Sequence, residues 1–144
     1  MVKTQQNYLE KEIMQGTSLD HINLLYGKAI NSLRLAKKIL EEGESTLEAI
    51  TKKANALSKA TDILIYLQAI LDLKKGGEIA KNLNEIYEIL INELISCSFS
   101  PDLKKIEDAI EILENLKKTW HAVKEINMPK PNHINVPHTA SLKA

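Results

Sequence analysis

The chain has 144 residues, a length that fits one domain with a single core. Its 19 basic and 19 acidic side chains cancel, so no overall charge attracts nucleic acid or an anionic membrane surface. The single cysteine, Cys97, excludes an internal disulfide and is expected to be a small buried side chain. No apolar run reaches the roughly 18–20 residues that span a bilayer, and the polar N-terminus lacks the apolar stretch of a signal peptide. We therefore expect a cytoplasmic protein.

The composition and the two ends of the chain favour a helical centre with irregular flanks. Leu, Ile and Ala are abundant, whereas aromatic residues make up 4% of the chain and glycines number 5. Residues 1–17 are mostly polar with a few apolar positions, among them Tyr8, and predict a short amphipathic arm that orders only where it docks. Residues 127–144 hold three of the four prolines and no apolar period, which predicts a disordered tail.

Between these ends, apolar side chains recur at spacings of three and four residues, the period of an amphipathic helix. The first such run begins after the capping residues Thr17 and Ser18 and ends before Gly43, which suits a left-handed C-terminal cap. The second run covers residues 47–71. Its stretch over residues 63–67 is apolar nearly all round, so we expect that part to be covered on more than one side.

Glycine and proline separate the remaining two runs. Gly76 and Gly77 predict a sharp turn with positive φ at both positions, because only glycine adopts that backbone freely. A third run follows to residue 94 and includes Tyr87. Ser100 and Pro101 predict the start of the fourth run, with the serine as the cap and the proline as the first helical residue.

Four amphipathic helices with short connections pack most simply as an antiparallel up-down-up-down bundle, since short loops make consecutive helices neighbours. We therefore predict an all-α four-helix bundle domain over residues 18–126, an N-terminal arm over residues 1–17 and a flexible tail over residues 127–144. The third helix is expected to be shorter than the others. That difference would leave a groove along it that the domain itself does not fill.

The sequence lacks the motifs that bind nucleotide phosphates, hold zinc or present a nucleophilic serine. No glutamate lies three residues before a histidine, as a di-iron bundle requires. His21 and His121 are expected to be solvated or capping residues, and the two histidines of the tail form no closed metal site. We expect no enzymatic activity, no cofactor and no bound metal ion.

What remains is an excess of apolar and amphipathic side chains. The four tyrosines, Tyr8, Tyr26, Tyr66 and Tyr87, suit a groove that is dry when occupied and wet when empty. Each tyrosine could equally pack at the edge of the core, and the sequence leaves both interpretations open. A bundle of this kind is well suited to bind a helix of a partner protein in a groove.

Several segments resemble the FliS family, the flagellar export chaperones that bind flagellin. The turn sequence LDLKKGGEIAKNL of residues 71–83, followed by Tyr87, is similar to the centre of that family. The resemblance covers about residues 7–126. The supporting segments are Asn7-Tyr8 near the N-terminus, Leu24-Leu25-Tyr26 and Ala29-Ile30 in the first helix, and Leu116 with Trp120 in the closing helix.

The resemblance implies a cytoplasmic secretion chaperone that binds the C-terminal helical segment of flagellin, blocks premature polymerisation and keeps flagellin competent for export. It also points to the flagellar export gate as a further contact. The glycines Gly76 and Gly77 are expected to form a structural turn. The expected partner-binding residues are Tyr8, Ile22, Leu25, Tyr26, Ala29, Ile79, Leu83 and Tyr87.

A second interpretation belongs to a different functional class. A helical bundle with excess apolar surface can instead be a structural or regulatory module that associates with itself, and a homodimer of the unbound protein is part of that expectation. Mixing the protein with flagellin separates the two interpretations, because a chaperone forms a heterodimer and a self-associating module ignores flagellin.

Overall fold

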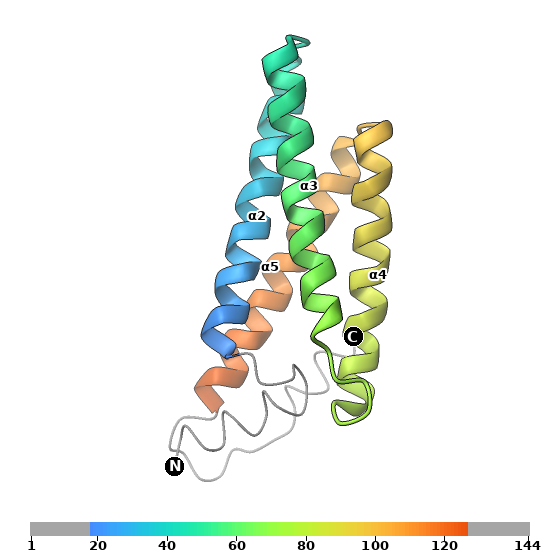
Figure 1. The fold of residues 1–144 in the computed structure, drawn as a ribbon. Helices are drawn as coiled ribbons and strands as arrows, with labels where there is room; N and C mark the ends of the chain where they lie inside the picture. The colour runs from blue at the N-terminus through green and yellow to red at the C-terminus, as the bar shows by residue number, and fades with distance from the viewer. Residues whose placement is uncertain (1–17, 127–144) are drawn as a thin grey trace.

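The computed structural model describes residues 18–126, and the side chains of residues 18–122. In this part of the chain four helices follow one another: α2 (Leu19–Glu42), α3 (Leu47–Ala69), α4 (Gly77–Phe99) and α5 (Leu103–Ile126). They run alternately up and down and pack side by side, as Figure 1 shows. The prediction of an all-α, antiparallel four-helix bundle is confirmed. The predicted arm and tail lie outside the described residues.

The cap of α2 forms as the sequence predicts, and α3 has a similar hydroxyl cap that was not predicted. The Ser18 hydroxyl accepts a hydrogen bond from the His21 amide at 3.1 Å, and the Thr46 hydroxyl accepts one from the Ala49 amide at 3.1 Å. At the end of α2, Gly43 has φ of 71° and donates its amide to carbonyl groups of the last turn.

The start of α5 differs from the prediction. The carboxylate of Asp102 accepts hydrogen bonds from the amides of Lys104 and Lys105, at 3.1 and 3.3 Å. Ser100 instead follows the last residue of α4. The cap is therefore Asp102, because a carboxylate both accepts these amides and meets the positive end of the helix dipole.

The turn between α3 and α4 also corrects one expectation. Gly77 has φ of 58°, in the left-handed region, but Gly76 has φ of −78°, which any residue adopts. The predicted positive φ is therefore wrong for Gly76. The chain turns with the help of Asp72, whose carboxylate accepts hydrogen bonds from the amides of Lys74 and Lys75.

We predict that Gly77→Ala lowers the free energy of unfolding by about 1 kcal/mol, because an L-residue is strained at that φ. No neighbouring atom lies within 4 Å of the added Cβ, so the cost comes from the backbone alone. Gly43→Ala should cost a similar amount for the same reason. Urea melts of both variants, with Gly76→Ala as the control, measure the difference. Equal stability of the Gly76→Ala and Gly77→Ala variants would contradict it.

The helices form a ring in which α2 packs on α3 and α5, and α3 packs on α4. The contact between α4 and α5 is the thinnest of the four, although a loop of only three residues joins them. The largest fully buried side chains include Trp120, Tyr26 and Tyr87. The core therefore contains three aromatic groups with polar atoms, which need hydrogen-bond partners there.

The expectation of a short third helix is wrong. The four helices have 24, 23, 23 and 24 residues, so none is much shorter than its neighbours. The two hairpins are instead shifted along the bundle axis. In Figure 1, α4 begins beyond the end of α3, and the tip of the α2–α3 hairpin projects past the α4–α5 hairpin. The exposed apolar surface described below is therefore explained by this shift rather than by a short α4.

Candidate partner-binding surface

The structure places most of the predicted partner-binding residues in the core. Leu25 and Ile79 are partly buried, and Tyr8 lies outside the described residues. Five others have no exposed surface: Ile22, Tyr26, Ala29, Leu83 and Tyr87. These five cannot touch a partner while the bundle keeps this conformation. Their contact with a partner stays a prediction, and it would require the helices to separate.

Tyr26, Tyr87 and Trp120 form a hydrogen-bonded cluster inside the bundle. The two tyrosine hydroxyl groups lie 2.5 Å apart, and the Trp120 indole N–H donates to the Tyr26 hydroxyl at 2.8 Å. The three residues belong to α2, α4 and α5, respectively. Of the two interpretations that the sequence leaves open for Tyr26 and Tyr87, the structure supports core packing, and the hydroxyl groups satisfy one another there.

Burial raises the pKa of both tyrosines above the ordinary value of 10.0. For Tyr26 the hydrogen bonds from Tyr87 and Trp120 offset part of the rise. For Tyr87 the neighbouring Tyr26 adds to it. Both side chains therefore stay neutral in the folded protein at pH values where free tyrosine ionises.

We predict that Tyr26→Phe destabilises the protein more than Tyr87→Phe does. Removing the Tyr26 hydroxyl leaves the buried Trp120 N–H without an acceptor, which costs about 1–3 kcal/mol. Removing the Tyr87 hydroxyl keeps the Trp120–Tyr26 hydrogen bond and should cost about 1 kcal/mol. Chemical denaturation of the two variants measures the difference. A larger loss for Tyr87→Phe would contradict the assigned donor and acceptor.

The raised pKa values also predict a dependence of stability on alkaline pH. Their contribution is complete below pH 10 and falls as the pH rises above it, because tyrosines ionise in the unfolded chain while Tyr26 and Tyr87 stay protonated in the fold. Each tyrosine lowers the free energy of unfolding by about 1.4 kcal/mol per pH unit in that range. Melts at several pH values should show a shallower decline for the Tyr26→Phe, Tyr87→Phe double variant. If the free energy of unfolding of the double variant declined with pH as steeply as that of the unmodified protein, this explanation would be wrong.

A different set of apolar side chains is exposed along the junction of α3 and α4. The Gln68 side chain donates to the Glu88 carboxylate at 2.8 Å, which marks the sides of α3 and α4 that face each other. Counting from these two residues in steps of three and four gives one row on each helix. The exposed apolar residues on these rows are Leu47, Ile50 and Ile65 of α3, and Ile95 and Phe99 of α4. We call these five residues the α3/α4 apolar surface.

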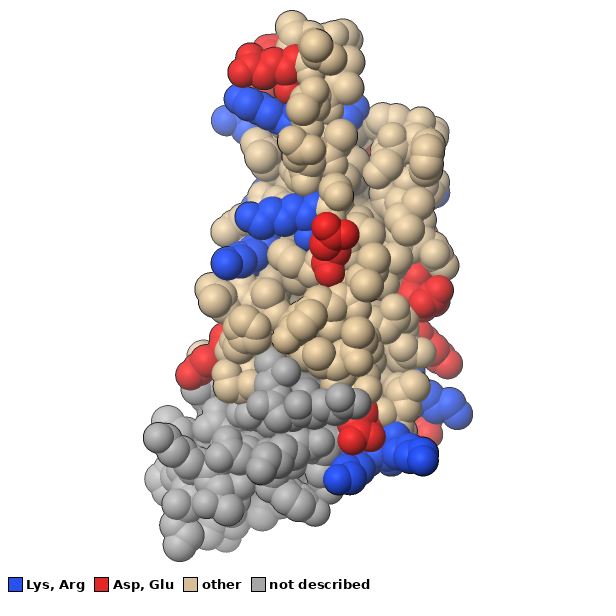
Figure 2. All heavy atoms as spheres, viewed as in Figure 1, with Lys and Arg blue, Asp and Glu red and all other residues tan. Residues whose placement is uncertain are grey.

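Charged side chains are sparse on the α4 part of this surface. In Figure 2, the upper part of α4 carries hardly any charged side chains, whereas charged side chains of both signs stand along α3. Phe99 and Leu47 are 85% and 80% exposed, an unusual position for side chains of this size. Between the exposed apolar positions the two rows hold Ala54, Ser58, Thr61 and Asn92, and the exposed Asp62 lies three residues before Ile65 on the same side of α3.

The sequence gives a partial signal for this surface. The apolar run of α3 predicts cover on more than one side, and Leu57, Leu64 and Leu67 are indeed buried. Periodicity alone does not reveal that Leu47 and Ile50 project beyond α4, since that depends on the shift between hairpins. Phe99 belongs to none of the predicted apolar faces and was missed.

Within residues 18–126, no group of three or more His, Cys, Asp or Glu side chains is placed to hold a metal ion. No helix in the same part of the chain is long and apolar enough to cross a membrane. Cys97 is buried, as expected, and burial raises the pKa of its thiol, which makes it less reactive.

Comparisons with known proteins agree on one family. A family model described as flagellar protein FliS matches residues 1–127. The flagellar secretion chaperone FliS of Salmonella typhimurium is 34% identical over 116 residues, which cover 80% of this chain and 82% of that protein. FliS of Vibrio cholerae is 31% identical over 102 residues, or 71% of each chain. The flagellar secretion chaperone FliSB of Pseudomonas aeruginosa is 28% identical over 123 residues, covering 85% and 94%.

The fold and its exposed surface define a small helical bundle with an apolar face available to another protein. Within that class, the chain belongs to the FliS family. The resemblance in residues 71–83 and the first helix is thereby confirmed. The relatives named above are secretion chaperones, which are not a class of enzyme.

Proposed function

We propose that this protein is a cytoplasmic secretion chaperone for flagellin, which binds the C-terminal helical segment of flagellin and blocks its premature polymerisation. Membership of the FliS family carries the proposal, because the matched relatives are flagellar secretion chaperones. A polymerising subunit needs apolar surfaces that associate with other subunits, and such surfaces are sticky before assembly. A chaperone that covers them keeps the subunit apart until export.

The α3/α4 apolar surface supports the proposal. An amphipathic helix can bind there with its apolar side on Ile95 and Phe99, while Leu47 and Ile50 extend the contact toward the tip of the α2–α3 hairpin. The uncharged positions along these rows limit the cost of burying unpaired ions under the partner. If the bound segment is disordered beforehand, folding it costs about 2–5 kcal/mol, which keeps the complex reversible.

The residues predicted from the resemblance then take two different roles. Leu25 and Ile79 keep exposed surface and remain proposed contacts, together with Tyr8. The buried residues, including Tyr26 and Tyr87, are proposed to hold the helices in the arrangement that presents the apolar surface. Their substitution should therefore weaken binding mainly by destabilising the fold.

We predict that Ile95→Lys and Phe99→Lys each weaken flagellin binding by about 1–3 kcal/mol, since each places a charge in an interface that must become dry. Leu35→Lys is the matched control, because Leu35 of α2 is 45% exposed and Ile95 is 43% exposed. Calorimetric titration with a C-terminal flagellin segment measures the affinity. Urea melts should show little change in stability for all three variants.

A sedimentation experiment distinguishes a chaperone from a self-associating module. Sedimentation of the protein with and without flagellin should give a 1:1 heterodimer for a chaperone. A homodimer that ignores flagellin, and that Phe99→Lys converts to a monomer, would overturn the proposal and favour self-association. Equal loss of binding in Leu35→Lys would place the contact elsewhere on the bundle.

A further inference from the structure

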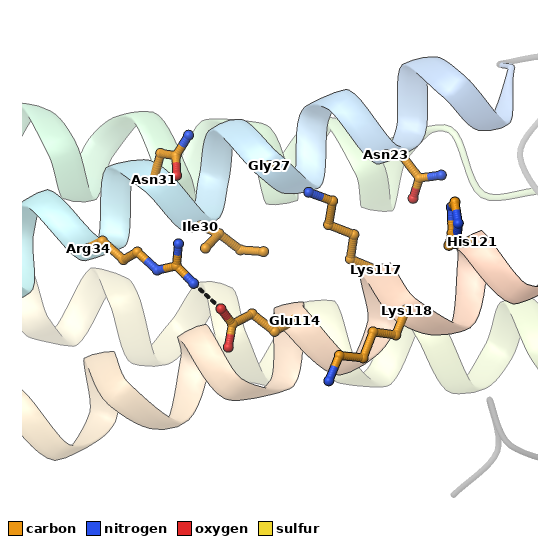
Figure 3. A pocket seen from close by; sticks show the side chains of 9 residues that line it. All are labelled: Asn23, Gly27, Ile30, Asn31, Arg34, Glu114, Lys117, Lys118 and His121. Carbon is orange, nitrogen blue, oxygen red and sulfur yellow. Dashed lines mark hydrogen bonds and ion pairs between the residues drawn. The ribbon is translucent and has the colours of Figure 1, made fainter.

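The second feature of the surface is a polar pocket between α2 and α5, with a volume of about 520 Å³. In the ring of helices this pair lies opposite the α3/α4 pair, so the pocket and the apolar surface face different directions. Figure 3 shows side chains from both helices around the opening. The polar residues and the glycine that line it are Asn23, Gly27, Asn31, Arg34, Glu114, Lys117, Lys118 and His121.

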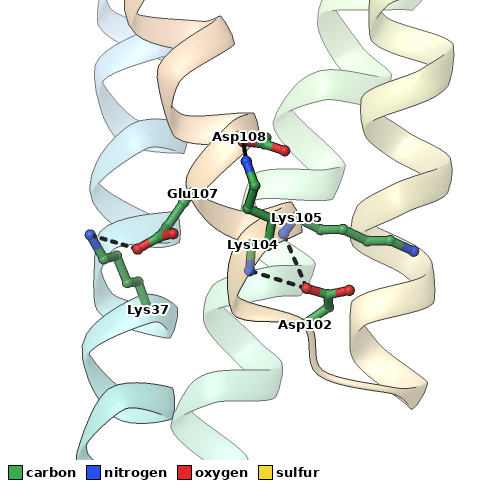
Figure 4. Close-up of polar contacts among 6 residues, drawn as sticks. All are labelled: Lys37, Asp102, Lys104, Lys105, Glu107 and Asp108. Carbon is green, nitrogen blue, oxygen red and sulfur yellow. Dashed lines mark hydrogen bonds and ion pairs between the residues drawn. The ribbon is translucent and has the colours of Figure 1, made fainter.

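Ion pairs join α2 to α5 along one part of this junction. The Lys37 ammonium lies 3.5 Å from the Glu107 carboxylate, as Figure 4 shows. Arg34 pairs with Glu114 farther along the same two helices, at the edge of the pocket. In both pairs the base belongs to α2 and the acid to α5. The junction is thus held by opposite charges up to the pocket, where the pattern changes.

Of the residues that line the pocket, Glu114 is the acid, and it already pairs with Arg34, whereas two further bases, Lys117 and Lys118, also line it. The Lys117 ammonium nitrogen lies 3.5 Å from the point where a Cβ would stand on Gly27. Position 27 has no side chain that could pair with it. Among the described residues no ion pair reaches Lys117 or Lys118. The glycine therefore leaves both a cavity and an ammonium group without a carboxylate partner.

Asn23 adds a second unsatisfied group to the same cavity. Its side-chain oxygen is buried and receives no hydrogen bond from any described residue. Figure 3 shows the Asn23 amide on the α2 wall, across from the Lys117 side chain. An amide can turn over and donate its NH₂ group instead. Asn23 and Lys117 could then donate together to one acceptor, and the apolar side chain of Ile30 lines the same pocket.

We infer that this pocket binds a carboxylate of an Asp or Glu side chain in an acidic segment of a partner polypeptide. A carboxylate accepts several hydrogen bonds and is attracted by Lys117, Lys118 and the neighbouring Arg34. Ile30 suits the methylene groups of an acidic side chain. Since the pocket lies on the opposite side of the bundle from the apolar surface, the acidic segment can bind while that surface is occupied. The inference goes beyond the proposed chaperone function.

The test uses the full chain and a capped hexapeptide of alternating Asp and Glu, with the corresponding Asn and Gln peptide as the control. NMR titration should shift the backbone amides of Gly27, Arg34 and Lys117 with the acidic peptide and not with the control. Lys117→Gln should weaken the acidic peptide about tenfold. Added salt should weaken it as well, because the attraction is partly exposed to solvent.

Two substitutions of Gly27 form a pair of variants that differ in charge but not in shape. Gly27→Asp supplies the missing carboxylate from the chain itself, so it should abolish peptide binding. Gly27→Asn has the same shape without the charge and should retain binding within about threefold. Peptide binding that survives Gly27→Asp, or shifts confined to other helices, would overturn the inference. So would equally tight binding of glutarate, which would make the pocket a site for small dicarboxylates.

Flagellin affinity of the same variants keeps this inference separate from the proposed function. Gly27→Asp and Lys117→Gln should bind flagellin as the unmodified protein does, because neither position belongs to the apolar surface. Loss of flagellin binding in Gly27→Asp but not in Gly27→Asn would make the pocket part of the flagellin site and overturn its independence. If flagellin fails to bind any form while the acidic peptide binds as described, only the proposed function falls.

Discussion

The hydrogen-bonded cluster of Tyr26, Tyr87 and Trp120 is the constraint on which the rest of the bundle depends. Tyr26 and Tyr87 belong to α2 and α4, which lie diagonally across the ring and pack directly on each other very little. Trp120 brings α5 into the same cluster. A purely apolar core tolerates sliding of one helix along another, whereas buried hydroxyl groups are satisfied in only one register. The cluster therefore fixes the register of α2, α4 and α5, and α3 is tied to α2 by the short turn between Glu42 and Leu47.

That register decides what the protein exposes. Because α4 is displaced along the axis relative to α3, the first turns of α3 extend past the end of α4. Leu47 and Ile50 are then 80% and 48% exposed, and Phe99 stands at the end of α4. An unshifted bundle of the same helices would bury much of this surface against itself. Stability at the centre and availability at the α3/α4 junction follow from the same arrangement.

The sequence predicts the helices well and their relative placement poorly. Ser18 and Gly43 act locally, through hydrogen bonds to amides or carbonyls three or four residues away, so composition and spacing are enough to identify them. Asp102 was missed because serine, proline and aspartate all favour a helix start, and only the backbone shows which of them caps it. Gly76 and Gly77 look alike in sequence but differ in φ.

The residues of the candidate sites show the same contrast between what the local sequence predicts and what depends on the packing of the helices. Tyr26 and Tyr87 lie on the predicted apolar faces, but periodicity cannot say whether an amphipathic side chain at that position points to a groove or to another tyrosine 61 residues away. Phe99 and Ile95 depend on the displacement of α4, which no local pattern encodes. The pocket beside Gly27 depends on the meeting of α2 and α5, two helices that are far apart in the sequence.

The two faces of the bundle also differ in the kind of attraction that they offer to a partner. At α3 and α4 the surface is largely apolar, so a bound helix there gains mainly from the removal of water, an attraction that salt does not screen. At α2 and α5 the helices are joined by Lys37–Glu107 and Arg34–Glu114, and the attraction for a further acid is electrostatic. A partner on one face therefore neither competes with the other face for contacts nor responds to the same conditions. A small bundle can in this way hold one protein by its apolar side and still present a charged side to a second.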